Sequence, residues 1–168
     1  FEVIRIILKV SEKEIIPRFL NLEPDEIFKK NNGKIVTIAD LKAEQELDKE
    51  LSRLIKGSKV IGEEKAAQDI SILKYLDGNK PVWIIDPIDG TKNFSSGKPC
   101  FAVMVALILN KKIMASWIHN PITKNTIHAY LNKGAWEGKR RLKIKPQVPL
   151  NKMIGSFPQN LVRKLEEY

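Results

Sequence analysis

The stretch that decides the fold runs from Val82 to Phe94 and reads Val82-Trp83-Ile84-Ile85-Asp86-Pro87-Ile88-Asp89-Gly90-Thr91-Lys92-Asn93-Phe94. Its first four residues are β-branched or aromatic, which predicts a short buried strand. Two aspartates follow, three residues apart, and the proline between them stiffens the turn that ends the strand. The turn therefore directs both carboxylates into one small volume.

The two carboxylates, Asp86 and Asp89, indicate a cation site. Acids held this close raise each other's pKa unless a cation lies between them, and hard oxygen ligands suit Mg²⁺. Gly90 permits a close backbone approach, and a helical turn beginning at Thr91 would direct free N–H groups toward an anion such as phosphate. The residues alone leave another interpretation open, since Asp-Pro and Asp-Gly are also ordinary turn dipeptides of plain loops.

The run from Trp83 to Phe94 resembles the signature of the inositol monophosphatase family, the magnesium-dependent, lithium-sensitive phosphatases that also include bisphosphate nucleotidases. The resemblance covers roughly residues 35–142. It implies an α+β fold, a layered α/β sandwich in which paired helices pack on a large antiparallel sheet. Family members run on past the length of this chain and contain a Trp-Asp element that it lacks, so the second lobe is expected to be truncated and turnover by this chain alone weak.

An upstream threonine and aspartate, Thr37 and Asp40, have two compatible interpretations. By themselves they form the capping box of a helix that continues to Gly57. They also resemble the family's Val-Thr-x-x-Asp element, which implies that Asp40 pairs with Thr91 and polarises the hydroxyl that activates water.

The pair Glu63-Glu64 follows a short predicted strand, Lys59 to Gly62. Alone, it is typical of a solvated helix start. Placed upstream of the two aspartates it resembles the family's Gly-Glu-Glu element, whose second glutamate binds metal and helps to deprotonate water. The resemblance therefore assigns this role to Glu64.

The resemblance implies a complete set of site residues. The catalytic residues are Glu64, Thr91 and Asp40. The metal ligands are Glu64, Asp86, the carbonyl of Ile88, and Asp89. Substrate phosphate contacts Asp89, Gly90 and Thr91. Two or three Mg²⁺ ions are expected, with Mn²⁺ as a substitute, one activating the attacking water and another neutralising the leaving alkoxide.

The implied activity is the hydrolysis of inositol monophosphate or a similar small sugar or polyol phosphate. One alternative is a 3′(2′),5′-bisphosphate nucleotidase, because Lys92 is frequent in that branch. A third hypothesis is a non-catalytic lobe that binds RNA or a transcription partner through its basic surface, since the net charge is +9. Family members are often homodimers, so a homodimer is one expected assembly.

Composition sets outer limits on these interpretations. The chain is 43% hydrophobic and 29% charged, as is typical of globular proteins, and no run approaches the roughly 18 apolar residues of a membrane span. The start of the sequence lacks the pattern of a signal peptide. The single cysteine, Cys100, excludes an internal disulfide, favours a reducing cytoplasm and is expected to be buried beside Phe101. The basic run 138–145 is more typical of an edge strand than of a polyanion site, so nucleic-acid binding is not expected.

The remaining pattern predicts the flanks of the domain. A helical stripe over 3–20 is interrupted near Ser11 and ends around Pro17, and strands at 101–109, 113–119 and 125–131 form a meander. His119 and His128 lie on neighbouring strands and are interpreted as structural. We divide the chain into an N-terminal metal-binding domain, residues 1–146, and the start of an incomplete C-terminal lobe, residues 147–168.

Overall fold

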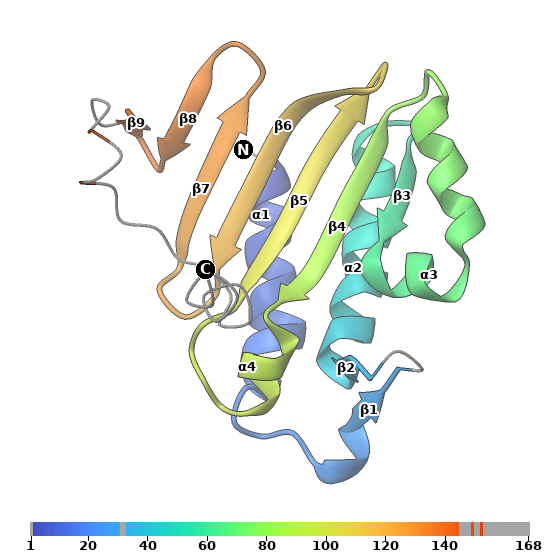
Figure 1. Cartoon of the computed structure of the whole chain (residues 1–168), viewed down its shortest axis with the longest axis vertical. Helices are drawn as coiled ribbons and strands as arrows, with labels where there is room; N and C mark the ends of the chain where they lie inside the picture. The colour runs from blue at the N-terminus through green and yellow to red at the C-terminus, as the bar shows by residue number, and fades with distance from the viewer. Residues whose placement is uncertain (1, 31–32, 145–148, 150–151, 153–168) are drawn as a thin grey trace, which may run out of the picture.

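The computed structural model describes residues 2–30, 33–144, 149 and 152. It contains a seven-stranded sheet in the order β3-β4-β5-β6-β7-β8-β9, and helices α1 and α2 lie across one face of it (Figure 1). The α+β sandwich expected from the sequence is confirmed. The predicted boundary of a second lobe at 147–168 lies outside the described residues, apart from Pro149 and Lys152.

The elements follow the hydrophobic pattern closely. The helices are α1 (Glu2–Val10), α2 (Ile38–Leu54), α3 (Glu63–Gln68) and α4 (Thr91–Ser95), with a 3₁₀ segment at Ile70–Asp77. The main strands are β3 (Lys59–Gly62), β4 (Val82–Asp89), β5 (Ala102–Leu109), β6 (Lys112–Asn120), β7 (Asn125–Tyr130), β8 (Gly134–Glu137) and β9 (Arg140–Leu142). Strands β1 (Ile27–Lys29) and β2 (Ile35–Thr37) form a separate two-stranded sheet beside the start of α2.

The sheet is mixed, which corrects the prediction of a wholly antiparallel one. Strand β3 pairs with β4 in parallel, Val60 opposite Trp83, whereas the pairs from β4 to β9 are antiparallel. The physical reason is the connection: α3 and the 3₁₀ segment lead the chain back to the other end of the sheet before β4 begins, as parallel neighbours require. The carboxyl ends of β3 and β4 therefore lie at the same edge.

The core lies between the sheet and the two long helices. Alternate residues of the central strands, Trp83 and Ile85 on β4 and Val103 and Val105 on β5, face α1 and α2 and are almost fully buried. The helices contribute apolar stripes at helical spacing: Val3, Ile6, Ile7, Val10, Ala43, Leu47 and Leu51. The packing of α2 against β4 is what brings its first turns close to the end of that strand.

The predicted interruption of the first helix is present. Residues Ser11–Ile15 form a π-helical turn, in which the Ser11 hydroxyl donates a hydrogen bond to the Ile7 carbonyl at 2.7 Å. A 3₁₀ turn over Ile16–Arg18 follows, since Pro17 has no N–H to continue the α-helix.

Two surface predictions have opposite outcomes. Strand β9 is the edge strand of the sheet, as predicted from its basic residues. Cys100, by contrast, is exposed, and the prediction that it is buried is wrong. It lies in the loop before β5, and the neighbouring Phe101 occupies the core instead, in contact with Phe19 and Phe94. In the described part of the chain, no helix is both long enough and apolar enough to cross a membrane.

His119 makes folding stability depend on pH. The ring is 1% exposed, and its Nδ1 lies 2.9 Å from the Thr126 hydroxyl. Burial lowers the pKa of the imidazole from its usual 6.5, so the folded protein binds the proton more weakly than the unfolded chain. The resulting stability is fully present above pH 6.5 and is lost as the pH falls through the lowered pKa.

We therefore expect the free energy of unfolding to fall more between pH 7.5 and pH 5 in the wild type than in His119→Gln, by about 0.5 kcal/mol. Urea unfolding of both proteins at the two pH values measures this difference, and the other titrating groups cancel because both proteins contain them. Parallel pH profiles would contradict the assignment to His119.

Candidate functional site

A cavity of about 820 Å³ opens at the edge where β3 and β4 end. Strand β4 and the turn after it form one wall, and the turn from β3 into α3 forms another. Its polar lining residues are Lys34, Glu63, Asp86, Asp89, Thr91 and Lys92. Five of the seven residues predicted for the site, namely Asp86, Ile88, Asp89, Gly90 and Thr91, line this cavity.

A β-bulge sets the positions of the two aspartates. Asp86 lies opposite Met104 and Asp89 opposite Ala102, so β4 contains one more residue than β5 across this interval. Pro87, which has no N–H to donate, occupies the bulge. The strand thus continues through the motif and bends there, where the sequence predicted that it would end.

Asp86 is the most strongly perturbed acid of the site. Its Oδ1 atom is buried and has no hydrogen-bond partner among the described residues. Burial, followed by the negative charges of Glu63 and Asp89, raises the pKa of Asp86 to about 7. A buried carboxylate oxygen without a partner is costly, and a bound cation would remove that cost.

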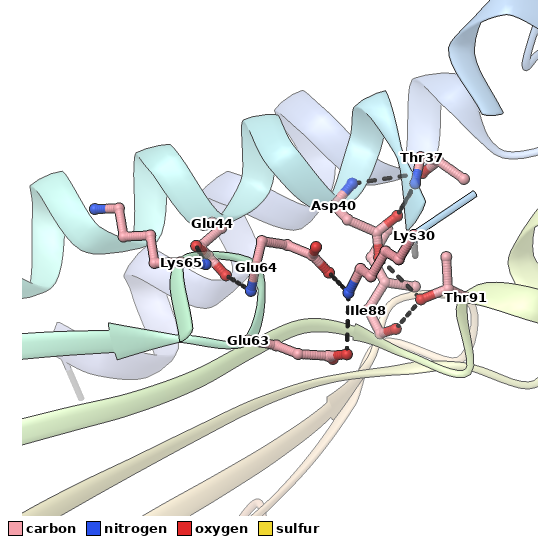
Figure 2. Close-up of polar contacts among 9 residues, drawn as sticks. All are labelled: Lys30, Thr37, Asp40, Glu44, Glu63, Glu64, Lys65, Ile88 and Thr91. Carbon is pink, nitrogen blue, oxygen red and sulfur yellow. Dashed lines mark hydrogen bonds and ion pairs between the residues drawn. The ribbon is translucent and has the colours of Figure 1, made fainter. Parts of the chain in front are cut away.

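Asp40 and Thr91 are in contact, as the resemblance implied. The Thr91 hydroxyl lies 2.9 Å from Asp40 Oδ1 and 2.9 Å from the Ile88 carbonyl oxygen (Figure 2). The other Asp40 oxygen accepts hydrogen bonds from Thr37, from its N–H at 2.8 Å and its hydroxyl at 2.5 Å. Burial raises the pKa of Asp40, although the hydrogen bonds from Thr37 and Thr91 oppose the shift. Asp40 thus caps α2 and holds Thr91 with one carboxylate.

The two glutamates after β3 line different cavities, although the carboxylates of both bind the same Lys30 Nζ (Figure 2). Glu63 lines the cavity that contains Asp86 and Asp89. Glu64 is 6% exposed and lines a second cavity of about 620 Å³ on the other side of the turn. The structure therefore places Glu63 in the cavity of the two aspartates, and the metal-ligand role of Glu64 stays a prediction. The residues alone do not separate the two, because adjacent residues of a short helix differ only in helical phase, whereas the resemblance assigns the role to the second.

Lys30 bridges the two glutamates and was not anticipated from the sequence. Its Nζ donates to Glu64 Oε1 at 2.8 Å and to Glu63 Oε1 at 3.3 Å (Figure 2). Burial alone lowers the pKa of Lys30, but the hydrogen bond and charge of Glu64 and the charge of Glu63 outweigh it and raise the pKa above 10.5. Lys30 thus supplies positive charge to both glutamates.

The donor set fits a hard divalent cation in chemistry. Glu63, Asp86 and Asp89 supply carboxylate oxygens, and the Ile88 carbonyl supplies another oxygen. Within residues 2–30 and 33–144, however, no three acidic, histidine or cysteine side chains already converge on one point. Binding would therefore require some of these side chains to move closer together.

The turn after Asp89 has the geometry of an anion contact. Gly90 has φ +94°, and its carbonyl accepts the N–H groups of Asn93 and Phe94 at 2.8 and 3.0 Å. A Cβ at this position would lie 2.9 Å from the Cys100 carbonyl oxygen, so only glycine fits. The first N–H groups of α4 have no acceptor within the helix, and Lys92 adds positive charge to the same cavity.

Comparisons with known proteins point to one family. The sequence model of the inositol monophosphatase family matches residues 2–164. The chain is 35% identical over 127 residues to an inositol monophosphatase from Dictyostelium discoideum, and 29% identical over 133 residues to a fructose-1,6-bisphosphatase/inositol-1-monophosphatase from Thermotoga maritima. These alignments cover 74% and 79% of this chain but 45% and 48% of the relatives.

Solved structures share the fold. A Thermotoga maritima IMPase superposes with a TM-score of 0.80 at 24% identity, over 98% of this chain and 61% of that one. A protein from Bartonella henselae, the extragenic suppressor protein suhB, superposes with a TM-score of 0.69 at 28% identity, over 86% and 54% of the two chains. The chain spans about half the length of the curated relatives it matches. On the family match and the shared fold, this chain belongs to the inositol monophosphatase family.

Proposed function

We propose that this chain forms the metal- and phosphate-binding part of a Mg²⁺-dependent phosphatase that hydrolyses a small sugar or polyol monoester such as inositol monophosphate. The observation that carries the proposal is the buried Asp86 oxygen without a partner, beside the negative charges of Glu63 and Asp89. Family membership supports the reaction class, because the relatives are named as phosphatases of inositol monophosphate and fructose 1,6-bisphosphate.

The proposed cation ligands combine the family resemblance with the residues that line the cavity. We assign the cation to Glu64, Asp86, Asp89 and the Ile88 carbonyl, as the resemblance implies, and we add Glu63 as a further candidate because it lines the cavity. Two or three Mg²⁺ ions, or Mn²⁺ in their place, and inhibition by Li⁺ belong to the same proposal. When bound, the cations would stabilise charge on the phosphate and make a water molecule more acidic.

The protein's own groups would orient the reactants. The Thr91 hydroxyl has one proton, which it donates to Asp40 or to the Ile88 carbonyl, so the lone pairs of its oxygen remain available to accept a hydrogen bond from the attacking water. Asp40 holds that hydroxyl in place and takes up positive charge that develops on it. The N–H groups of Gly90 and Thr91 would contact the phosphate oxygens, as would Lys92 from the same cavity.

A nucleotide substrate is the second candidate. Lys92 lines the cavity, and a cationic side chain there would suit a substrate that carries a second phosphate. Proteins with this fold accept both chemistries in crystals, since a staphylococcal IMPase has been solved with inositol monophosphate and with 2′-AMP. The RNA-binding alternative has less support, because Arg140 and Arg141 lie on β9, at the opposite edge of the sheet from the cavity.

Substrate choice is tested by phosphate release from inositol 1-phosphate and from adenosine 3′,5′-bisphosphate, each with Mg²⁺ and with added LiCl. We expect faster release from the inositol ester and inhibition by lithium. Faster release from the nucleotide would shift the assignment to the nucleotidase branch, whereas RNA binding without Mg²⁺-dependent hydrolysis would support the third hypothesis.

Asp86→Asn should stabilise the metal-free protein at pH 8 while abolishing its response to Mg²⁺. Because its pKa is raised to about 7, Asp86 is ionised at pH 8 at a cost to the folded state, and the neutral amide removes that cost. We expect the free energy of unfolding to rise by about 1 kcal/mol, a value reduced for solvent screening.

The measurement is urea unfolding of both proteins, without MgCl₂ and with MgCl₂ at ten times its Kd. A ligand of the folded state stabilises only the protein that binds it, by roughly 1.4 kcal/mol at that concentration. Wild type should therefore be the less stable protein without MgCl₂ and the more stable one with it. Asp77→Asn is the matched control, because Asp77 is an exposed aspartate that pairs with Lys111. Equal stabilisation of wild type and Asp86→Asn by Mg²⁺ would refute the ligand role.

Thr91→Val should lower kcat on the preferred ester by roughly 100-fold and leave the Kd for Mg²⁺ within about threefold, because it removes the water-orienting hydroxyl and retains the volume. Thr91→Ser keeps the hydroxyl and should retain most of the rate. Calorimetry and phosphate release measure the two quantities separately, and similar rates in the two variants would count against a role for the hydroxyl.

A further inference from the structure

We infer that Glu44 is a positioning residue of this site: its buried carboxylate anchors the turn from β3 into α3 and thereby fixes where Glu63 and Glu64 start relative to Asp86 and Asp89. The inference rests on the proposed function for its consequence, the binding of a cation, but the anchoring itself is independent of metal. Glu44 itself does not line the cavity.

The anchoring consists of two hydrogen bonds. Glu44 Oε2 accepts the N–H of Glu64 at 2.7 Å, and Oε1 accepts the N–H of Lys65 at 3.0 Å (Figure 2). These N–H groups lie in the first turn of α3, where no carbonyl of the same helix can accept them. The N-cap residue is Gly62, which has no side chain to do so. Glu44, from another helix, therefore supplies the cap that the local sequence lacks.

The contact leaves no room for a side chain at position 62. A Cβ on Gly62 would overlap the carboxylate group of Glu44. The backbone of Gly62 has φ −97°, which any residue adopts, so glycine is needed here for the close approach of Glu44 and not for its conformation. Gly62 and Glu44 thus form one fitted contact directly before Glu63.

The same helix holds the opposite wall of the cavity. Asp40 precedes Glu44 by four residues on α2, so the two carboxylates lie on one face of the helix, one turn apart. Asp40 accepts from Thr91 in the turn after β4, whereas Glu44 accepts from the turn after β3. Because β3 and β4 are parallel neighbours, both turns leave the sheet at one edge, and α2 sets the distance between them.

Burying the Glu44 carboxylate lowers the free energy of unfolding, and a neutral cap of α3 would not do so. Glu44 is 3% exposed, and burial raises its pKa while the two backbone hydrogen bonds oppose the shift. Hydrogen bonds to an ionised acceptor are shorter and stronger than neutral ones, and two of them on one carboxylate restrict the turn in both direction and distance. That restriction is what a site of carboxylates needs, since misplacing one ligand weakens the binding of the cation.

The test combines hydrogen exchange and calorimetry on the whole 168-residue chain. In Glu44→Ala, we expect the Glu64 and Lys65 amides of the metal-free protein to exchange at least 10-fold faster and the Kd for Mg²⁺ to rise about 10-fold. Glu44→Gln retains one acceptor oxygen and should give intermediate values for both. Glu50→Gln is the matched control, because Glu50 lies on the same helix, pairs with Lys9 and should change neither.

Gly62→Ala probes the same contact from the other side. Its Cβ should displace the Glu44 carboxylate and weaken Mg²⁺ binding about as much as Glu44→Ala does. In the double variant the Cβ occupies space that the carboxylate has vacated, so the two effects should combine to much less than their product.

Three results would overturn the inference: unchanged exchange of the Glu64 and Lys65 amides in Glu44→Ala, faster exchange with an unchanged Kd for Mg²⁺, or independent effects in the double variant. The first shows that no anchoring exists, and the second that Glu44 is only a helix cap. If the wild type takes up neither Mg²⁺ nor Mn²⁺, the proposed function fails, and the exchange rates alone then decide whether Glu44 holds the turn.

Discussion

The structure depends on the hydrogen bonds that two buried carboxylates of α2 accept. Asp40 and Glu44 are 2% and 3% exposed, yet each accepts hydrogen bonds from a different turn at the edge of the sheet. Burying a carboxylate is costly unless its oxygens are satisfied, so the two turns cannot shift independently of the helix without exposing that cost. The apolar stripe on the same helix holds α2 against β4. Because the two carboxylates lie on this fixed helix, the polar groups that they bind are fixed as well.

The negative charges of the cavity destabilise the folded protein and favour the binding of a cation. Asp86 retains an unsatisfied buried oxygen, and its neighbours Glu63 and Asp89 add negative charge that raises its pKa. Lys30 donates hydrogen bonds to both glutamates, and Lys34 and Lys92 line the cavity. Repulsion among these carboxylates lowers the free energy of unfolding. A bound cation removes the repulsion, so its binding is more favourable than it would be at a site without it. The backbone also departs from regular geometry at the site, in the bulge at Pro87 and in the left-handed conformation of Gly90.

Much of this arrangement was accessible from local sequence signals. The apolar run before Asp86 predicted β4, the spacing of Thr37 and Asp40 predicted the capping box, and Gly90 predicted the tight turn. These features depend on residues close together in the chain, where period, turn chemistry and capping rules apply directly. The contact between Asp40 and Thr91 joins distant segments, and it was anticipated only through the resemblance to a family.

The sequence predictions that were wrong depend on contacts between segments far apart in the chain. The parallel pairing of β3 depends on the route of the chain through α3 and the 3₁₀ segment, and the exposure of Cys100 depends on which neighbour fills the space beside Phe19 and Phe94. Neither is encoded in a local pattern.

The sequence by itself determined the elements, the apolar faces and the family, because each follows from residues within a few positions or from one contiguous motif. Only the tertiary structure decided that Glu63 lines the cavity of the aspartates, that Lys30 bridges both glutamates, and that Glu44 caps a helix twenty residues away. The physical reason is that the direction of a side chain at a helix start is set by whichever remote group satisfies its backbone N–H groups, and that group is identified only once α2 and β3 are packed together.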